Sequence, residues 1–197
     1  MPGMNDRAGA AAHARAVLEQ AATMHRTAAA GDVEAIVRGA HVVSTALAQG
    51  HKVLVCGNGG SAADAQHFAA ELVGRYQGER RAWPVMALAA DVAVMTSVSN
   101  DYGFDAVFAR QVEAWGQAGD VLVGITTSGT SANVNAALTR ARTIGMATVG
   151  LTGRNGGDTA ALADVHINVP SSETPRVQEV QRTILHVLCE LIERDLR

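Results

Sequence analysis

The chain contains 197 residues, of which 48% are hydrophobic, and its formal net charge at pH 7 is −3. This length and apolar content are enough to bury one sizeable core, so we expect a single domain over residues 1–197. No run of Lys or Arg is longer than the pair Arg80-Arg81, which argues against a basic face that binds a nucleic-acid backbone.

The sequence also argues against a membrane protein. Residues 1–12 lack the continuous apolar segment of a secretory signal, and no later stretch approaches the roughly 20 apolar residues that span a bilayer. The only two cysteines, Cys56 and Cys189, lie in apolar surroundings that favour buried, reduced thiols. We therefore expect a cytoplasmic protein with neither a membrane nor nucleic acid as its partner.

Two helices are predicted at the start of the chain, near residues 10–29 and 33–48, because Ala, Val and Leu recur there with helical spacing. Gly31-Asp32 separates them. We expect residues 1–50 to form an N-terminal helical arm outside the main body, where apolar helices often pair with another subunit. The alternative is that they fold back on their own domain.

After Gly50 the pattern changes to short apolar runs that end in small or polar residues, each followed by a longer helical segment. Continuous Val/Ile/Leu strands that alternate with helices are typical of a parallel sheet covered on both faces. The sequence therefore predicts a three-layer α/β sandwich with a five-stranded parallel sheet. The predicted strands are residues 53–56, 85–89, 121–126, 147–151 and 165–169.

Ligands of such sheets bind at the carboxyl ends of the strands. The first strand ends in Cys56-Gly57-Asn58-Gly59-Gly60-Ser61, and a helix is predicted from about Ala62. Glycines let a ligand approach the backbone closely, Ser61 would cap the helix, and the free N–H groups would face an anion or sugar oxygens. A tight strand-to-helix turn without a ligand is the alternative. The loop matches neither the dinucleotide-binding nor the P-loop glycine motif.

The third strand ends in Thr126-Thr127-Ser128-Gly129-Thr130-Ser131 and runs into a helix near Ala132. Clustered hydroxyls beside a helix N-terminus, without a lysine, form a phosphate cradle of neutral donors and the helix dipole. Such a cradle suits a phosphate that is held and not transferred. Simple Ser/Thr capping would explain one or two of these hydroxyls but not the whole cluster.

Two predicted helices carry candidate acid–base or metal-binding residues. His67 and Glu71 are four residues apart and so share one helix face. Gln178 and His186 are eight apart, which is about 80° around the helix axis, and are only roughly co-facial. Imidazole nitrogen, carboxylate oxygen and amide oxygen would together suit Zn²⁺. Histidines on helices are also often packed or solvated, so the residue pattern alone leaves both interpretations open.

Three further polar residues are candidates for substrate contacts. Asn100-Asp101 follows an apolar helical run and is expected near the carboxyl edge of the second strand, with an exposed turn as the alternative. Arg75 lies one helical turn beyond Glu71. It would reach either a substrate oxygen or a partner in a surface salt bridge.

The segment CGNGGSAADAQHFAAELVGRY, residues 56–76, resembles the phosphoheptose isomerases of the SIS (sugar isomerase) family. The likeness recurs in SNDYGF, GITTSGTSANV, LTGRNGG and RVQEVQ...HVLCELIE, and so covers nearly all of the chain after the arm. The resemblance implies a flavodoxin-like SIS fold and a homotetramer with sites between protomers. It implies one Zn²⁺ per subunit, held by His67, Glu71, Gln178 and His186. It implies a sugar near Asn58, Gly59, Gly60, Asn100 and Asp101, with its phosphate at Thr126, Thr127, Ser128 and Ser131.

The implied reaction converts D-sedoheptulose 7-phosphate to D-glycero-D-manno-heptose 7-phosphate, the entry to ADP- or GDP-heptose for lipopolysaccharide or capsule. Moving a carbonyl from C2 to C1 by way of an enediol(ate) requires a base that carries a proton between the carbons and an acid that moves protons between the oxygens. Glu71 is the candidate base and His186 the candidate acid. If both also bind the metal, their free titration is compromised.

Two other functions occur among SIS domains. An adaptor that binds the bacterial replication initiator shares the G-N-G-G-S-A-A and A-Q-H-F patterns, and this chain resembles it at least as closely over residues 61–68. Such relatives lack the carboxylate and imidazole that stand here at Glu71 and His186, and they carry an arginine in place of the loop serine. A sugar-phosphate-sensing regulator would have a helix-turn-helix before the sheet, and none is predicted. These features favour the isomerase, although Thr126 and Thr130 stand where relatives often carry Ser and Asn.

Overall fold

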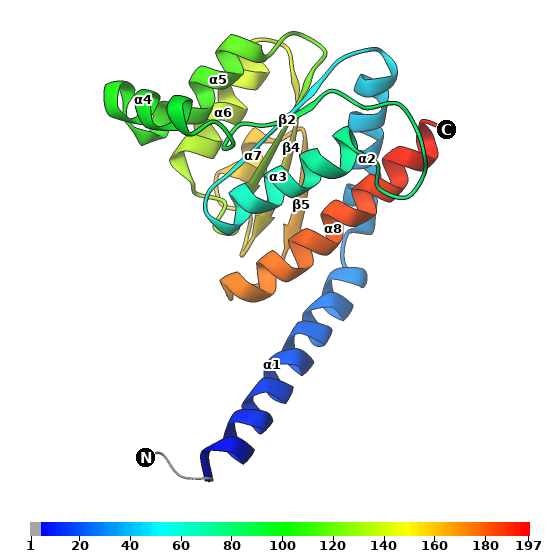
Figure 1. Ribbon diagram of the computed structural model, residues 1–197, viewed down its shortest axis with the longest axis vertical. Helices are drawn as coiled ribbons and strands as arrows, with labels where there is room; N and C mark the ends of the chain where they lie inside the picture. Colours follow the sequence, from blue (N-terminus) through cyan, green and yellow to red (C-terminus); the bar gives the residue numbers. More distant parts are fainter. Residues whose placement is uncertain (1–4) are drawn as a thin grey trace.

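The computed structural model describes residues 5–197 of the protein, which form one sheet with helices on both faces (Figure 1). The strands are β1 (Val53–Gly57), β2 (Val85–Ala87), β3 (Val121–Thr126), β4 (Ala147–Gly153) and β5 (Val165–Val169). The helices are α1 (Asn5–Ala29), α2 (Val33–Ala48), α3 (Gly60–Val73), α4 (Val92–Tyr102), α5 (Val107–Trp115), α6 (Ala132–Thr143), α7 (Thr159–Leu162) and α8 (Thr174–Asp195), with the 3₁₀ turn η1 (Phe104–Ala106) before α5.

The five strands are all parallel and lie in the order β2-β1-β3-β4-β5. This is the flavodoxin-like order, and it confirms the predicted five-stranded α/β sheet. Strand ends differ from the prediction by one or two residues: β1 continues to Gly57, β4 continues to Gly153, and β2 stops at Ala87. The winding of the chain reverses between β1 and β3, which end side by side with Gly57 opposite Ile125. Sheets of this class hold ligands outside the strand ends at such a reversal.

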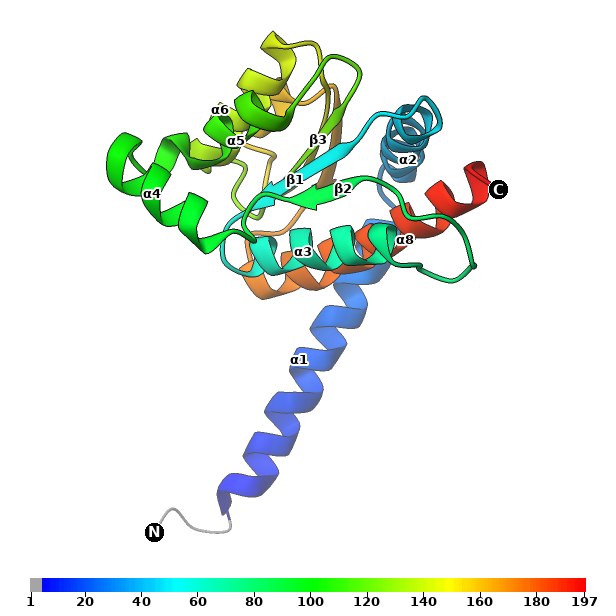
Figure 2. The same cartoon turned by 45° about the horizontal axis from the view of Figure 1, so that its top comes forward.

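Alternate residues of β1 and β3 enter different cores, which makes the domain three layers thick. Val53 and Val55 of β1 pack into a core with α2, α3 and α8, whereas Leu54 and Cys56 pack into a second core with α5 and α6. Figure 2 shows α3 and α8 on one side of the sheet and α5 and α6 on the other. Since side chains alternate between the two faces of a strand, Val53 and Val55 point to the same face, and α3 and α8 both pack on that face.

The N-terminal segment divides into two parts. The helices predicted near residues 10–29 and 33–48 are present as α1 and α2. Helix α2 is part of the packed body, because Ala35, Val43 and Leu47 are each 1% exposed and belong to the core with α8. Helix α1 projects from the body in Figure 1, and its Leu18 is 71% exposed. The expectation of helices outside the body therefore holds for α1 alone.

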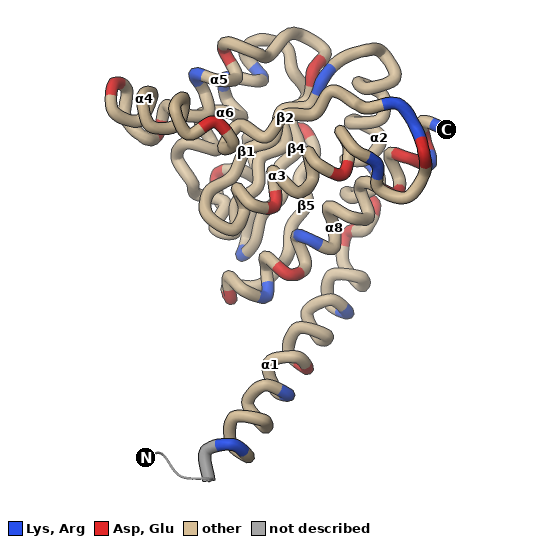
Figure 3. Tube along the Cα trace, viewed as in Figure 1, with Lys and Arg blue, Asp and Glu red and all other residues tan. Residues whose placement is uncertain are grey.

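The distribution of charged residues and the burial of the cysteines agree with the expectations from the sequence. Lys/Arg and Asp/Glu positions are interspersed along the body in Figure 3. Over residues 5–197, no helix combines the length and the apolar character that crossing a membrane requires. Cys56 and Cys189 are buried free thiols, as predicted. Burial raises the pKa of Cys56 to about 12, so this thiol stays protonated and unreactive.

Candidate active site

Three predicted residues meet between α3 and α8. His67 and Glu71 come from α3, and His186 comes from α8. The Nε2 atoms of His67 and His186 are 2.8 Å apart, and His67 Nε2 lies 3.5 Å from Glu71 Oε1. One ligand atom from each residue lies within 4.8 Å of the other two, and all three residues are half-buried. The predicted common face of His67 and Glu71 is thus confirmed, and α8 supplies the third group.

The donor atoms of this trio suit a transition-metal ion. Two imidazole nitrogens and a carboxylate oxygen that converge on one point are ligands that Zn²⁺ accepts. In the structure, one imidazole N–H donates to the other ring at Nε2. Loss of that single proton would leave two imidazole lone pairs directed at the same point, so these residues fit a Zn²⁺ ion.

Gln178 lies further along the same contact between α3 and α8. Its side chain borders a cavity of about 320 Å³ together with Gly60 and Asp64. A Cβ atom at position 60 would clash with the Gln178 amide, so glycine is needed there for α8 to approach the first turn of α3. Gly60 and His67 are seven residues apart and therefore share a face of α3. All four predicted metal ligands consequently lie along one line of contact between the two helices.

The loop after β1 turns into its helix earlier than predicted. Gly59 is the N-cap residue, with a φ of 55°, and α3 begins at Gly60. Because glycine adopts this left-handed conformation without strain, the chain enters the helix at once. Ser61 is therefore a buried residue inside the first turn, and the prediction that it caps the helix is wrong.

Asn58 joins the loops after β1 and β3. Its amide nitrogen donates to Asn133 Oδ1 at 2.8 Å, and the amide nitrogen of Asn133 donates back to Asn58 Oδ1 at 2.8 Å. No role is predicted for Asn133 from the residue pattern. Its position could have suggested a role, because Asn133 is the second residue of α6, directly after the hydroxyl-rich loop. An amide side chain there lies close to the strand ends.

The hydroxyl cluster predicted after β3 is present. Thr126 Oγ1 lies 2.9 Å from Ser131 Oγ and 3.3 Å from Ser128 Oγ, and Ser131 is the N-cap residue of α6. The hydroxyl and backbone N–H of Thr130 both donate to Ser128 Oγ at 3.1 Å. Thr127 is half-buried in the same loop. The hydroxyls thus satisfy one another at a helix N-terminus, where an anion would find several donors already grouped.

Three other candidates lie apart from the trio within this chain. Asn100 and Asp101 are exposed in the last turns of α4 and bond to each other at 2.9 Å. They belong to the helix itself, which continues to Tyr102, and Figure 1 shows α4 at the outer edge of the molecule, away from α8. Arg75 is 61% exposed by its side chain and faces Glu79 at 3.7 Å, as in the surface salt-bridge alternative.

Tyr76 is a neighbour of the trio that the residue pattern did not reveal. Its ring lies 5.7 Å from the His186 ring, with 31° between the planes. Burial, followed by the charge of Glu190, raises the pKa of Tyr76, so its phenol stays protonated. Tyr76 lies beyond the end of α3, in the loop that leads to β2. This loop passes back over α8, which brings the rings of Tyr76 and His186 together.

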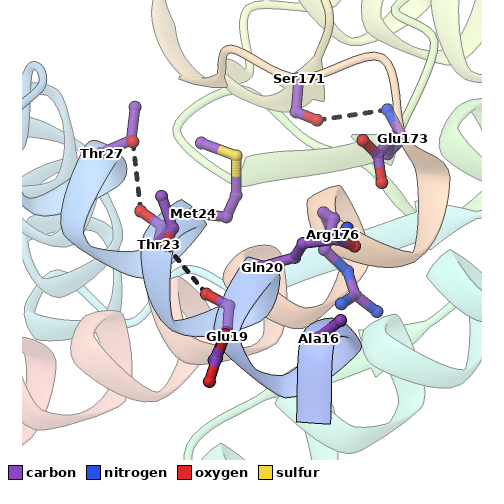
Figure 4. Close-up of a pocket in the computed structure, with 9 residues that line it drawn as sticks. All are labelled: Ala16, Glu19, Gln20, Thr23, Met24, Thr27, Ser171, Glu173 and Arg176. Carbon is purple, nitrogen blue, oxygen red and sulfur yellow. Dashed lines mark hydrogen bonds between the residues drawn. The ribbon is translucent and has the colours of Figure 1, made fainter. Parts of the chain in front are cut away.

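A separate hollow of about 460 Å³ lies where α1 crosses the start of α8 (Figure 4). Thr23 and Thr27 of α1 bond to carbonyls within their own helix, and Arg176 of α8 donates to the Val17 carbonyl at 2.7 Å. None of the predicted site residues lines this hollow. It marks how α1 is held on α8, and it is distinct from the cavity at Gln178.

Known proteins resemble this chain over most of its length. The SIS domain family model matches residues 10–153, a range that ends before α8. The phosphoheptose isomerase of Geobacter sulfurreducens is 55% identical over 157 residues, which is 80% of this chain and 83% of that protein. The structure of phosphoheptose isomerase GmhA from Neisseria gonorrhoeae is 43% identical, with a TM-score of 0.88, over 92% of this chain and 97% of that one. A phosphoheptose isomerase structure from Francisella tularensis is 37% identical, with a TM-score of 0.90, over 94% and 98%.

Proposed function

Because the chain belongs to the SIS domain family, we propose that it is an aldose–ketose isomerase that converts D-sedoheptulose 7-phosphate to D-glycero-D-manno-heptose 7-phosphate. The similar proteins described above are phosphoheptose isomerases, and the chain covers most of their length. The observation that carries the proposal is the meeting of His67, Glu71 and His186 at one point, since the reaction needs both a base and an acid.

Glu71 is the base in this proposal. Its carboxylate removes a proton from C1 of the ketose and returns it to C2, with an enediol(ate) between the two transfers. His186 moves protons between the oxygens on C1 and C2. One group thus carries the proton between the carbons, and the other moves protons between the oxygens.

Zn²⁺ is the metal we propose, one per subunit, with His67, Glu71, Gln178 and His186 as its ligands. When bound, the ion would polarise the sugar oxygens and stabilise negative charge on them. Support comes from the convergence of three of these side chains and from the position of Gln178 along the same helix contact. The protein contributes by holding the metal-ligand atoms of His67, Glu71 and His186 close together without the ion.

The substrate phosphate is assigned to the loop after β3, at Thr126, Thr127, Ser128 and Ser131. The sugar is assigned to Asn58, Gly59, Gly60, Ser61 and Gln178, because the loops after β1 and β3 are neighbours at the point where the winding of the chain reverses. A neutral cradle suits a phosphate that leaves with the product, since no charged lysine needs to release it.

A homotetramer with sites between protomers would account for the residues that stand apart. Arg75, Asn100 and Asp101 would then serve the site of a neighbouring subunit. Support comes from exposed apolar side chains on the projecting elements, which a monomer would leave in water: Leu18 on α1, Val92 and Tyr102 on α4, and Phe104 on η1. In this proposal residues 1–197 form one SIS domain, with α1 as its arm.

The first experiment is turnover of sedoheptulose 7-phosphate by the purified protein, with and without a chelator and with zinc restored. His186→Ala should abolish turnover, whereas His41→Ala, which removes an exposed imidazole from α2, should leave it unchanged. Restoration by zinc would support the metal. Absence of turnover under every metal condition would overturn the proposal, and binding to the replication initiator would then be tested by pull-down.

A further inference from the structure

The contact between α3 and α8 ends in a buried ion pair that the reaction does not use. Glu193 of α8 has a side chain that is 4% exposed, and its Oε1 lies 3.1 Å from Nε of Arg80, whose side chain is 11% exposed. Arg80 lies in the loop between α3 and β2. Figures 1 and 3 show this loop passing beside the C-terminal end of α8.

Arg80 fixes the end of the helix that carries His67 and Glu71. Its guanidinium donates to the carbonyl of Glu71 at 2.9 Å, of Leu72 at 2.9 Å and of Gly74 at 3.2 Å. These carbonyls belong to the last turn of α3 and its cap, where carbonyl oxygens have no N–H donor within the helix. The guanidinium also lies 3.6 Å from the centre of the Trp83 ring, which holds it from the other side.

Glu193 fixes the same loop onto α8. Its carboxylate accepts the backbone N–H groups of Tyr76 at 3.0 Å, of Gln77 at 3.3 Å and of Gly78 at 3.0 Å. Glu193 and His186 are seven residues apart and therefore lie on one face of α8, two turns from each other. The carboxylate that anchors the loop thus belongs to the same rigid helix as the proposed acid, and the anchored Tyr76 packs against that acid.

We propose that the Arg80–Glu193 pair is a positioning device for the site. By joining the C-terminal end of α3 to α8, it sets the separation at which His67 and Glu71 face His186. Neither residue touches the substrate in this arrangement, and both act through α3, α8 and Tyr76. The inference rests on the proposed function for its effect on zinc and turnover, but the positioning itself is a property of the chain alone.

A matched control exists at the amino end of β3, the central strand of the sheet. Asp120, just before β3, is a second buried carboxylate that accepts backbone N–H groups, from Lys52 at 2.9 Å and Gln117 at 2.8 Å, and it pairs with Lys52 Nζ at 2.6 Å. Glu193→Gln and Asp120→Asn therefore make the same chemical change at sites of similar burial. Arg80→Lys is the second test variant, because lysine keeps the charge but lacks the planar fork that reaches the carbonyls at the end of α3.

The test compares zinc affinity, by competition with a chromophoric chelator, with kcat, KM and urea unfolding. We expect Glu193→Gln and Arg80→Lys to weaken zinc binding by about 10- to 100-fold and to lower kcat with little change in KM. Asp120→Asn should lose stability but keep zinc affinity within about twofold of the wild type. Wild-type zinc affinity and kcat in both test variants, or equal losses in Asp120→Asn, would overturn the proposal.

A metal-free readout separates this proposal from the proposed function. NMR of the imidazole nitrogens should show the His67–His186 hydrogen bond in the wild type and in Asp120→Asn, and its loss in Glu193→Gln. If the wild type binds no zinc and turns over no substrate, the proposed function fails, and the imidazole spectra still decide the positioning role. An unchanged hydrogen bond in folded Glu193→Gln would refute it.

Discussion

The contact between α3 and α8 has two parts that differ in how fully their polar groups are paired. At its C-terminal end Glu193 is buried and accepts three backbone N–H groups and a guanidinium. In its middle His67, Glu71 and His186 are half-buried, and one imidazole–imidazole hydrogen bond joins the two histidines. Saturated groups hold a structure together, whereas groups with open donor or acceptor positions are available to a ligand. One helix pair therefore provides both rigidity and a reactive centre.

The largest expected effect tests the reactive part. Glu71→Gln replaces the base by a group of similar size that cannot accept the proton, and turnover should fall by about 10²- to 10⁴-fold. Urea unfolding of the metal-free variant should match that of the wild type, because the carboxylate is partly solvated and its only ionic partner is His67 at 3.5 Å in the part of the chain that the structure describes. Turnover near the wild-type level would remove Glu71 from the mechanism.

A smaller effect is expected in the loop after β3. Ser128→Ala removes a hydroxyl from the cradle and should weaken substrate binding by about 1 to 3 kcal/mol, since a phosphate hydrogen bond is lost. The measurement is KM for sedoheptulose 7-phosphate beside inhibition by inorganic phosphate, and both should weaken together. Thr139→Ala, on the exposed side of α6, is the control. If phosphate inhibition stays unchanged while substrate binding weakens, the loop contacts the sugar and not the phosphate.

The smallest expected effect is on the pH dependence of stability, and it comes from Glu193. Burial opposes ionisation of Glu193, but the N–H groups of Gly78, Tyr76 and Gln77, together with Arg80, outweigh it and lower the pKa of Glu193 below its ordinary value. The unfolded chain then binds this proton more readily, so the stabilisation is present above the ordinary pKa of about 4.3 and is lost as the pH falls through the folded-state pKa.

Urea unfolding of the metal-free protein between pH 6 and pH 3 checks that sign. The wild type should lose more stability on acidification than Glu193→Gln, which has no carboxyl group to protonate. Glu113→Gln, half-exposed on α5, should follow the wild type. Equal acid dependence in all three proteins would contradict a lowered pKa at Glu193.

Much of the fold could be predicted because it depends on local patterns. Continuous apolar strands between helical segments require a parallel sheet covered on both faces, and five such runs became five strands. The pairing of His67 with Glu71 followed from a spacing of four on one helix. The start of α3 could not be predicted as well, because the left-handed conformation of Gly59 depends on how the loop leaves the strand.

The sequence by itself determined the elements, the two strand-end loops and the residue types of the site, since each depends on neighbours within a few positions. Only the tertiary structure decided that α8 crosses α3 so that His186 meets His67, that Asn58 pairs with Asn133, and that Arg80 and Glu193 close the far end of the contact. These pairs are separated by 75 to 119 residues in the chain. No local periodicity encodes such distances, because they are set by the order of the strands and by the packing of helices on the sheet.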